Sequence, residues 1–486
     1  MIFSDENIKN IFGNEDAENE NPDRLKEYFF RNKAYDSLIA DLPIRIIVGH
    51  KGVGKSALLK ICHLEDQEKD YLTLWVRPND VFSSVDSEAK NFLNLIENWK
   101  IGLSTLILRK ALEGADLYDE ASKIEKITGG IRQAISILSE KYRAVLPGHQ
   151  TNKLIGTFLK TKKIRVYLDD LDRGWEARPE DIKNISALLN AVRDLAGENP
   201  NVQFRIGLRT DVYHLVRSSD ESTDKIESNL ILLSWSNHEI LTAMAKRIGT
   251  YFGENVDEYE LIKKQQLEIS KYLHRIITER FLHVGKWDNA PIHRILLSLT
   301  RKRPRDLVKL LVYAGKEAYR DGNKIITTEN LRRVFEKYSN ERMRDVINEF
   351  KTELPNVEAV VFGMRQTNKE RASGIGPVFT QDQLVVKMKS IIQSNNITFR
   401  NGIRPTPQEL ANFLFKIDFI TARLDTPNKV IRKHFEENQT LQTRHADFGF
   451  SWEIHPAYRW ALEPQSIDNL LNRIDLSDSD TPVSKS

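Results

Sequence analysis

Five short runs of apolar and β-branched residues alternate with longer stretches of helical periodicity over the first half of the chain. The runs lie at residues 44–48, 71–76, 163–168, 202–208 and 230–233. Runs of this kind, bounded by polar segments, are typical of strands buried on both faces of a parallel sheet. Because helical segments separate them, the pattern predicts an α/β core with a five-stranded parallel sheet.

The segments around these strands divide the first half of the chain. Residues 25–42 have the periodicity of a helical lead-in to the first strand, and an uninterrupted helical pattern separates the second strand from the third. We therefore expect a core at 24–236 with a helical insertion at 87–150. The acidic and polar residues 1–23 lack a strong periodic pattern, and we expect them to be flexible.

The pattern changes beyond the fifth strand, where helical periodicity dominates. It predicts an all-helical second domain at 237–352, and a glycine-rich break, Ser373–Pro377, precedes a terminal domain at 377–470. In that terminal domain two helices precede a strand-like end. A winged helix is one interpretation of this small α+β unit. The Ser- and Asp-rich residues 471–486 are expected to be a disordered tail.

Composition narrows the class of protein. The chain has 486 residues, 40% of them hydrophobic and 29% charged, which is enough for several packed cores with a polar surface. No apolar run reaches the roughly 18 residues of a membrane span. The only cysteine is Cys62, which excludes an internal disulfide and a multi-cysteine metal site. With an acidic start that is unlike a secretory leader, we expect a cytoplasmic protein with no membrane partner.

A glycine-rich segment follows the first predicted strand and precedes a predicted helix. It fits the pattern G-x-x-x-x-G-K-[ST], and Ala57 continues the helix after its eight residues: Gly49, His50, Lys51, Gly52, Val53, Gly54, Lys55 and Ser56. Glycines let the backbone wrap so that several N–H groups point at one phosphate chain, and the start of the helix adds a positive dipole end. In this pattern Lys55 reaches the β- and γ-phosphates, and the Ser56 hydroxyl binds Mg²⁺.

The alternative interpretation of this segment is a simple glycine-rich turn. The buried strand before it and the helix after it are the context that a phosphate loop requires, so we favour binding of ATP with Mg²⁺ as cofactors. GTP is less favoured, because no Asn-Lys-x-Asp guanine-binding motif occurs where a GTPase would have one.

The third predicted strand ends in two carboxylates. Asp169 and Asp170 directly follow the run at 163–168, and open α/β sheets bind ligands at the carboxyl ends of their strands. We expect Asp169 to hold Mg²⁺ and Asp170 to orient or deprotonate the attacking water. The alternative is that both side chains only cap the following turn. Nearby, a structural pairing of Arg173 with Asp172 is slightly favoured over a phosphate contact.

Two further positions are candidates for sensing the phosphate. Arg209 and Thr210 end the fourth predicted strand, which should lie beside the phosphate-loop strand, although Arg209 has the alternative of being a surface arginine. Arg305 begins a predicted helix of the second domain, directly after Pro304, and could point back toward the nucleotide. For Arg305 a nucleic-acid patch and a solvated basic face remain alternatives.

Four motifs occur in this order along the chain: GHKGVGKS, YLDDLDR, LRT and RPRDL. Together they resemble bacterial STAND and AAA+-related ATPases of the ASCE class. The lead-in before the phosphate loop is similar in particular to FunZ-like P-loop ATPases, and the DDLDR string resembles the KAP group. By this resemblance Asp169 and Asp170 are the magnesium and water pair, Arg209 is a first sensor and Arg305 a second.

The resemblance also implies a role. Families of this kind act as nucleotide-driven switches in prokaryotic conflict, such as antiphage defence, or in DNA transactions. We therefore expect a regulatory ATPase that forms a homo-oligomer or acts through a separate effector protein. The alternative is a DNA-binding, initiator-like ATPase that uses a C-terminal winged helix and the basic stretch 271–344. A scaffold that barely hydrolyses ATP also stays open, because Asp170 stands where many relatives have Glu.

Overall fold

The computed structural model describes ten stretches of the chain: residues 2–14, 20–69, 71–77, 91–114, 163–219, 226–282, 285–427, 429–437, 449–463 and 467–476. The chain divides into two compact units. One consists of Asp16–Lys26 and Arg31–Leu233, and we call it the sheet unit. The other consists of Met1–Glu15, Glu27–Phe30 and Ser234–Ser486, and we call it the helical unit.

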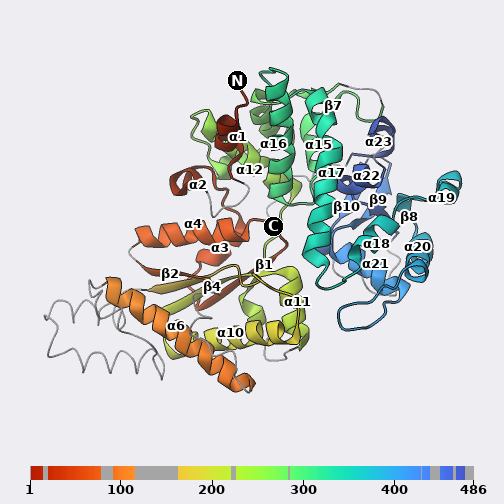
Figure 1. Cartoon of the computed structure of the whole chain (residues 1–486). Coiled ribbons are helices and arrows are strands. Elements are labelled where there is room, and N and C mark those ends of the chain that lie inside the picture. The colour runs from red at the N-terminus through yellow and green to blue at the C-terminus, as the bar shows by residue number, and fades with distance from the viewer. Residues whose placement is uncertain are drawn as a thin grey trace, which may run out of the picture. The chain divides into compact units, whose positions relative to one another are not determined.

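The sheet unit is built on a five-stranded parallel sheet (Figure 1). Its strands are β1 (Ile44–Gly49), β2 (Leu72–Val76), β3 (Ile164–Leu168), β4 (Val202–Arg209) and β5 (Leu230–Leu232). Their spatial order is β2-β3-β4-β1-β5, and all neighbouring pairs run parallel, which confirms the predicted sheet. β4 lies between β1 and β3, as in the ASCE class of P-loop ATPases.

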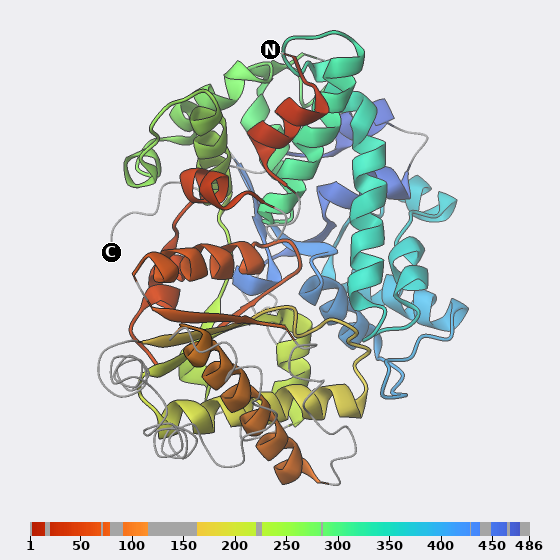
Figure 2. The ribbon, with the colours of Figure 1, turned by 60° about the vertical axis from the view of Figure 1, so that its left-hand side comes forward.

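Helices cover both faces of this sheet, which explains why its strands consist almost entirely of apolar residues. On one face lie α3 (Lys33–Ile39) and α4 (Lys55–Glu68), as Figure 2 also shows. On the other face lie α6 (Phe92–Gly114), α10 (Pro179–Glu198) and α11 (Thr210–Ser219). The core between the sheet and this second set of helices includes Trp99, Leu103 and Ile107 of α6. The predicted helical insertion is described only as α6, and residues 115–162 lie outside the described part of the chain.

The predicted continuous lead-in helix at 25–42 is wrong in detail, because two helices occupy it. α2 (Pro22–Tyr28) and α3 are separated by four residues, and the Asn32 side chain caps α3 by accepting a hydrogen bond from the Tyr35 N–H. Glu65 of α4 then holds α3 in place through Arg31, at 2.8 Å, and through the Tyr35 hydroxyl. A capping residue inside an otherwise helical pattern thus starts a second, separate helix.

The helical unit begins with a bundle of helices and short turns. Its elements are α1 (Asp5–Phe12), α12 (Asn237–Tyr251), α13 (Glu258–Leu261), α14 (Gln266–Ile269), the 3₁₀ helix η3 (Ser270–Arg275), α15 (Ile292–Ser298), α16 (Pro304–Arg320) and α17 (Thr328–Phe350). A two-stranded sheet of β6 (Arg280–Phe281) and β7 (Ala290–Pro291) is added to these helices. The expected helical character of this region is therefore correct, apart from that short hairpin-like pair.

Both ends of the chain contradict the expectation of disorder where they are described. At the N-terminal end α1 buries Ile8, Ile11 and Phe12 in the core of the helical unit. At the C-terminal end α23 (Ile467–Arg473) contributes to the same core, and Ile474 after it is fully buried. The apolar residues of α1 recur at helical spacing, but the acidic residues around them hid this signal. Residues 477–486 lie outside the described part.

The remainder of the helical unit is a small α+β arrangement. It consists of α18 (Val357–Gly363), α19 (Asn368–Ala372), β8 (Val378–Phe379), α20 (Gln381–Ser394), α21 (Pro407–Lys416), β9 (Ile420–Thr426), β10 (Lys429–Lys433), the 3₁₀ helix η4 (Phe435–Glu437), β11 (Ser451–Ile454), the 3₁₀ helix η6 (Pro456–Tyr458) and α22 (Arg459–Leu462). The four strands form an antiparallel sheet in the order β10-β9-β11-β8. Only the last of these strands was expected from the sequence. None of the helices in the described part of the chain has the length and apolar content that crossing a bilayer needs.

Candidate nucleotide-binding site

The glycine-rich loop connects β1, an inner strand of the sheet, to α4, as its motif requires. β1 ends at Gly49, and α4 begins at Lys55 with Gly54 as its N-cap. Gly54 has φ +100°, a left-handed conformation that a side chain would strain, and this explains the glycine at that position. The loop therefore places the N-terminus of α4, with its unpaired N–H groups and positive dipole end, at the carboxyl edge of the sheet.

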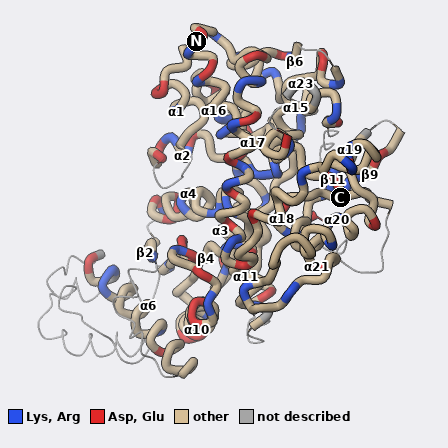
Figure 3. The backbone as a smooth tube through the Cα atoms, turned by 45° about the vertical axis from the view of Figure 1, so that its right-hand side comes forward, with Lys and Arg blue, Asp and Glu red and all other residues tan. Residues whose placement is uncertain are grey.

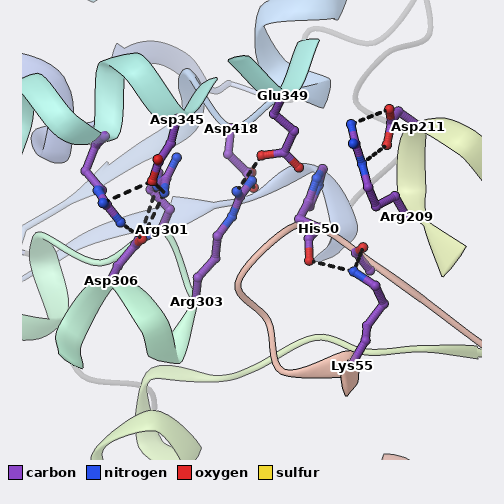
Figure 4. Close-up of polar contacts among 12 residues, drawn as sticks. His50, Lys55, Arg209, Asp211, Arg301, Arg303, Asp306, Asp345, Glu349 and Asp418 are labelled. Carbon is purple, nitrogen blue, oxygen red and sulfur yellow. Dashed lines mark hydrogen bonds and ion pairs between the residues drawn. The ribbon is translucent and has the colours of Figure 1, made fainter. Parts of the chain in front are cut away.

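The ammonium group of Lys55 lies over the loop that it follows. Its Nζ donates to the backbone carbonyls of Gly49, at 2.7 Å, and of His50, at 3.1 Å (Figure 4). His50 itself is 2% exposed, whereas Lys51 is exposed at the loop tip. The two carbonyls hold the ammonium group beside the loop that the motif assigns to the phosphate chain. The side chain is thus available to a phosphate group that enters the loop.

Asp169 lies directly after β3 and faces the start of α4. Its carboxylate is 4% exposed, and the Ser56 hydroxyl is its hydrogen-bond partner. Its Oδ2 atom is buried and makes no hydrogen bond with the described residues. Burial, together with repulsion from Asp170, raises the pKa of Asp169 above its usual value, against the opposing effects of Ser56 and Lys55.

A glycine on the adjacent strand makes room for this carboxylate. A Cβ atom on Gly207 of β4 would lie 3.0 Å from Asp169 Oδ1 and 3.0 Å from Leu59 Cδ1 of α4. The three elements β3, β4 and α4 therefore meet at Asp169 with no space for another methyl group. Ser56 and Asp169, the two expected magnesium ligands, are brought together by this packing.

The second carboxylate, Asp170, begins the loop after β3. It has φ +57°, a left-handed conformation that Asp and Asn tolerate better than other non-glycine residues. Its carbonyl accepts a hydrogen bond from the Arg173 N–H at 2.9 Å, so the chain turns sharply there. The side chain is partly exposed, in contrast to that of Asp169. This difference in burial is consistent with one carboxylate that holds a metal ion and one that reaches water.

Arg209 ends β4 in register with Gly49 of β1, so the prediction that these strand ends lie side by side is confirmed. Its guanidinium is held by two carboxylates. It donates to Asp211 at 2.7 and 3.0 Å (Figure 4) and to Asp172 at 3.1 Å. The predicted pairing of Asp172 with Arg173 is wrong, because Arg209 takes that place and Arg173 is exposed. Arg209 therefore connects the end of β4 to the loop that carries Asp170.

Thr210, the other predicted candidate at the end of β4, lies at the same edge of the sheet. It is 5% exposed, and its buried hydroxyl makes no hydrogen bond with the described residues. An unsatisfied buried hydroxyl costs free energy unless a ligand or water engages it. Its position directly after Arg209 was the only signal in the sequence. A threonine at a strand end is a weaker sequence signal than the arginine that precedes it.

Arg305 belongs to the helical unit, and its role as a second sensor stays a prediction. α16 begins at Pro304, as expected, so Arg305 lies in the first turn of that helix. The residues just before it form a buried network in the same unit. Arg301 and Arg342 both donate to Asp306 at distances between 2.7 and 2.8 Å (Figure 4). Burial alone would raise the pKa of Asp306, but the charges of the two arginines outweigh it and lower that pKa.

This network corrects the interpretation of 271–344 as an exposed basic belt. Arg301, Arg303 and Arg342 are 2% exposed or less, and each has a carboxylate partner. Arg303 pairs with Glu349 at 3.1 Å. Among the exposed cations of α17, several pair with acidic residues, so that blue and red segments intermingle along the helix (Figure 3). The high content of Lys and Arg in this stretch is therefore mainly structural.

Comparison with known proteins is decisive for one part of the chain. Residues 260–347 match the model of the FunZ-associated C-terminal helical domain. The chain is similar to FunZ-like P-loop ATPases. This match confirms the resemblance drawn from the lead-in and the phosphate loop, although it lies in a different part of the sequence. The matched residues, which we call the FunZ-associated domain, include α14, η3, β6, β7, α15, α16 and most of α17, and the Arg301–Asp306 pair lies among them.

A curated relative and two solved structures extend the comparison. The chain is 21% identical to an Escherichia coli (strain K12) protein named for transposon gamma-delta, over 96% of this chain and 70% of that protein. The ORC2 protein of Aeropyrum pernix covers 88% of each chain at 12% identity and a TM-score of 0.40. A Walker-type ATPase of Pyrococcus abyssi covers 90% of this chain and 96% of its own, at 13% identity and a TM-score of 0.40. Likenesses this slight say nothing about what the chain binds or does.

The FunZ-associated domain does not include the nucleotide-binding residues. The phosphate loop, Asp169 and Arg209 all precede residue 260, where the match begins. The assignment of these residues therefore depends on their motif and their geometry in the sheet unit. Arg305 is the one predicted site residue that lies within the FunZ-associated domain.

Proposed function

We propose that this protein binds and hydrolyses ATP with Mg²⁺ and works as a regulatory switch. One observation carries the proposal. The carboxylate of Asp169 is buried beside the Ser56 hydroxyl at the start of the phosphate-loop helix, and it has an oxygen without a hydrogen bond. A buried carboxylate left in this state is costly for a structural residue, but it suits the second coordination shell or the direct ligation of a metal ion.

The residues present fit a magnesium ion that is bound together with a triphosphate. Mg²⁺ is usually held by one or two protein oxygens, several waters and the phosphates. Ser56 and Asp169 supply such oxygens, and the described residues contain no cluster of three or more His, Cys, Asp or Glu that would hold a metal ion alone. When bound, the ion neutralises charge that develops on the transferred phosphoryl group.

The remaining roles follow from position. The loop N–H groups and Lys55 bind the β- and γ-phosphates, and the partly exposed Asp170 orients or deprotonates the attacking water. Thr210 offers a hydroxyl at the same edge of the sheet, to a γ-phosphate oxygen or to that water. Arg209 holds Asp172, and thereby the loop of Asp170, so its sensing role is indirect. ATP is the proposed nucleotide.

We further propose that the nucleotide state is read by other parts of the protein or by partners. The resemblance to STAND ATPases supports a switch whose output is a homo-oligomer or a separate effector protein, in antiphage defence or in a DNA transaction. Arg305, in the first turn of α16, is the proposed link between nucleotide state and the FunZ-associated domain. The curated relative named for a transposon agrees with a setting among mobile elements.

The test of the proposal is ATP hydrolysis by the purified chain and by Lys55→Ala. We expect turnover that requires Mg²⁺ and that falls to background in the variant, because the loop loses its only positioned ammonium group on the β- and γ-phosphates. Lys69→Ala is the matched control, since Lys69 is a half-exposed lysine at the other end of the same helix. Equal turnover by wild type and Lys55→Ala would refute the site. A wild type that binds ATP without turnover would support the scaffold alternative instead.

The initiator-like alternative, a DNA-binding ATPase, loses one of its two supports. The basic stretch 271–344 is largely committed to internal ion pairs, as Arg301, Arg303 and Arg342 illustrate. Its other support, the terminal α+β unit, is independent of that stretch.

A further inference from the structure

Residues 252–275 of the helical unit line a cavity that we call the polar groove, and the FunZ-associated domain begins within this segment. The volume of the cavity is about 320 Å³, which lies in the range of roughly 300–1,000 Å³ that is usual for small-molecule sites. Its lining consists of charged side chains and one tyrosine: Glu254, Lys264, Glu268, Lys271, Tyr272 and Arg275. None of these residues belongs to the proposed ATP site of the sheet unit.

One wall of the polar groove is a single face of a continuous helical segment. α14 runs directly into η3, and the lining residues of this wall recur along it at spacings of three and four: Glu268, Lys271, Tyr272 and Arg275. The opposite face of the same segment is packed into the core of the helical unit through Ile269 and Leu273, both fully buried. The four lining side chains therefore project from a backbone that the core fixes in place.

The end of α12 forms the facing wall and has a defined geometry too. The Gly253 N–H donates to the Thr250 carbonyl at 2.9 Å, and the Glu254 N–H to the Gly249 carbonyl at 3.0 Å. With Gly253 at φ +79°, this is the glycine-based end of a helix, and it sets the position of Glu254. A Cβ atom on Gly249 would lie 3.1 Å from Tyr272 Cε1, so the two walls are in close contact at their base.

An ion pair joins the two walls across the polar groove. The Arg275 guanidinium donates to the Glu254 carboxylate and lies 5.3 Å from the ring centre of Phe252 and 5.8 Å from that of Tyr272. The positive charge of Arg275 is thus balanced by a carboxylate and held between aromatic rings. A ligand in the polar groove must therefore be bound mainly by the other charged groups of the lining.

Three charged groups of the lining are left for a ligand. Lys264, Glu268 and Lys271 are exposed, and their side chains make no hydrogen bond or ion pair with the described residues. Elsewhere in the FunZ-associated domain Arg332 and Arg333 pair with acidic neighbours. Exposed lysines are ordinarily solvated, but these two border one cavity together with an acceptor and an aromatic ring. The polar groove thus offers two positive charges and one carboxylate to a single ligand.

These groups match the parts of a small phosphorylated ligand. A phosphate monoester has a charge of about −1.5 to −2 at neutral pH, which two lysines balance. The Glu268 carboxylate can accept hydrogen bonds from hydroxyl or amine groups, and the Tyr272 ring offers a flat face to a heterocycle. A triphosphate has a larger negative charge, which Glu268 and Glu254 would repel. Inorganic phosphate has neither a ring nor the donor groups.

We propose that the polar groove binds a nucleoside monophosphate, with its phosphate on Lys264 and Lys271, its hydroxyl or amine donors on Glu268 and its base against Tyr272. A free mononucleotide is favoured over a nucleic-acid strand, because the cavity has the size of a small-molecule site and carboxylates on both walls would repel a phosphate backbone. This goes beyond the proposed ATPase function and does not depend on it. It would give the protein a ligand input separate from the phosphate loop.

The test is photo-cross-linking of the full chain with 8-azido-AMP, followed by mapping of the labelled peptides by mass spectrometry. We expect label within residues 252–275 that AMP displaces. The variant Lys264→Glu/Lys271→Glu should lower the apparent affinity for AMP by about tenfold or more, because both phosphate contacts become repulsive. Lys369→Glu/Lys389→Glu is the control, since it makes the same change of charge on exposed lysines outside the lining and should bind AMP like wild type.

A second variant tests the contact with the base. Tyr272→Leu removes the ring but no charge, so it should weaken AMP binding about tenfold and leave displacement of the label by inorganic phosphate unchanged. A merely structural tyrosine would weaken both equally or neither. Thermal unfolding of each variant at the temperature of wild type shows that the fold is intact.

Several outcomes overturn the proposal. They are the absence of label within 252–275, an equal loss of affinity in both double variants, and displacement of the label by a single-stranded oligonucleotide at lower concentration than by AMP. Label confined to the phosphate loop and lost in Lys55→Ala would also contradict it. Under this account Lys55→Ala loses ATP turnover but keeps the label in the polar groove, so failure of the ATPase site and failure of the polar groove are distinguishable.

Discussion

A buried aspartate lies between α4 and the β3 segment at each end of the helix, and the hydrogen bonds of the two carboxylates differ. Near the start of the helix, Asp169 has the Ser56 hydroxyl as partner and an oxygen without a hydrogen bond. In the last turns of the helix, Asp66 is 1% exposed, and both of its oxygens accept from Arg165 of β3, at 2.8 and 2.7 Å. The Tyr167 hydroxyl donates to the same carboxylate.

Arg165, the partner of Asp66, also binds the segment before β1. Arg165 donates to Gln203 at 3.0 Å and to the Ile39 carbonyl at 3.2 Å, so its guanidinium is shared among three elements. The comparison separates two uses of a buried carboxylate. A carboxylate whose oxygens are all bonded fixes the helix on the strand, and one that is left open is ready for a ligand. Asp66 belongs to α4 and Asp169 follows β3, so both carboxylates connect the same helix to the same strand segment. The bonded carboxylate at the closed end of α4 thereby helps to set the position of the open carboxylate at its start, the open end.

The largest effect is expected at the closed end. Asp66→Ala leaves the guanidinium of Arg165 buried without its carboxylate, and it should lower the free energy of unfolding by about 3–5 kcal/mol. Chemical denaturation of the purified chain measures this loss. Glu260→Ala is the control, because its exposed ion pair with Lys263 should contribute no more than about 1 kcal/mol. Similar losses in both variants would mean that the buried pair has no special role.

At the open end the same kind of substitution should act on turnover instead. Asp169→Asn removes the charge that faces the magnesium position, so the turnover number should fall about a hundredfold or more. The free energy of unfolding should stay level or rise, because a buried carboxylate with a raised pKa is replaced by a neutral group. Rates of Mg-ATP hydrolysis test the expected fall in turnover, and denaturation curves test the expected free energy of unfolding. If Asp169→Asn were as destabilised as Asp66→Ala, the two buried aspartates would not differ in their roles.

The pH dependence of stability sharpens the comparison further. Since the folded protein holds the proton of Asp169 more tightly than the unfolded chain does, this residue costs stability once the pH rises above its unfolded pKa. The cost is complete above the raised folded pKa and vanishes in acid. The difference in unfolding free energy between Asp169→Asn and wild type should therefore be present at neutral pH and disappear toward the usual carboxyl pKa. A difference that grows in acid would have the wrong sign.

The smallest effect is expected from a single methyl group. Gly207→Ala places a Cβ against Asp169 Oδ1 and Leu59, each at 3.0 Å, and it should displace the carboxylate by a few tenths of an ångström. We expect about a tenfold fall in turnover, with about 1 kcal/mol lost in stability. Gly197→Ala is the control, because a Cβ there meets nothing within 4 Å, and this substitution should leave turnover unchanged. Equal turnover by Gly207→Ala and Gly197→Ala would show that Gly207 does not position Asp169.

The local motifs of the sheet unit could be predicted from the sequence, because their signals are local. The strand β1, the loop from Gly49 to Ser56 and the carboxylates after β3 are each specified by a few adjacent residues. The pairing of Asp66 with Arg165 joins residues 99 positions apart, and no spacing rule reveals such a contact. Likewise, only tertiary packing shows that Arg209 takes Asp172 as its partner.

The helical unit was harder to predict, because several of its charged residues are buried in ion pairs and are not exposed to solvent. Arg301 and Arg303 have the composition of a surface patch, but the structure buries both, Arg301 against the nearby Asp306 and Arg303 against the distant Glu349. The acidic start of the chain likewise concealed the apolar stripe of α1. Charge in a sequence therefore does not by itself distinguish a solvated face from a buried network of ion pairs. In the terminal α+β unit Lys369, Arg371 and Arg400 are exposed and have no ion-pair partner among the described residues, so charge does indicate the surface there.

The central claim is that the open carboxylate belongs to a Mg-nucleotide site. Calorimetric titration of the wild-type chain and of Asp169→Asn with ATP, in the presence and absence of Mg²⁺, tests it most directly. The account predicts binding by both proteins, with tightening by Mg²⁺ only in the wild type. Wild-type protein that gives no heat with Mg-ATP, or a variant that responds to Mg²⁺ as the wild type does, would contradict it.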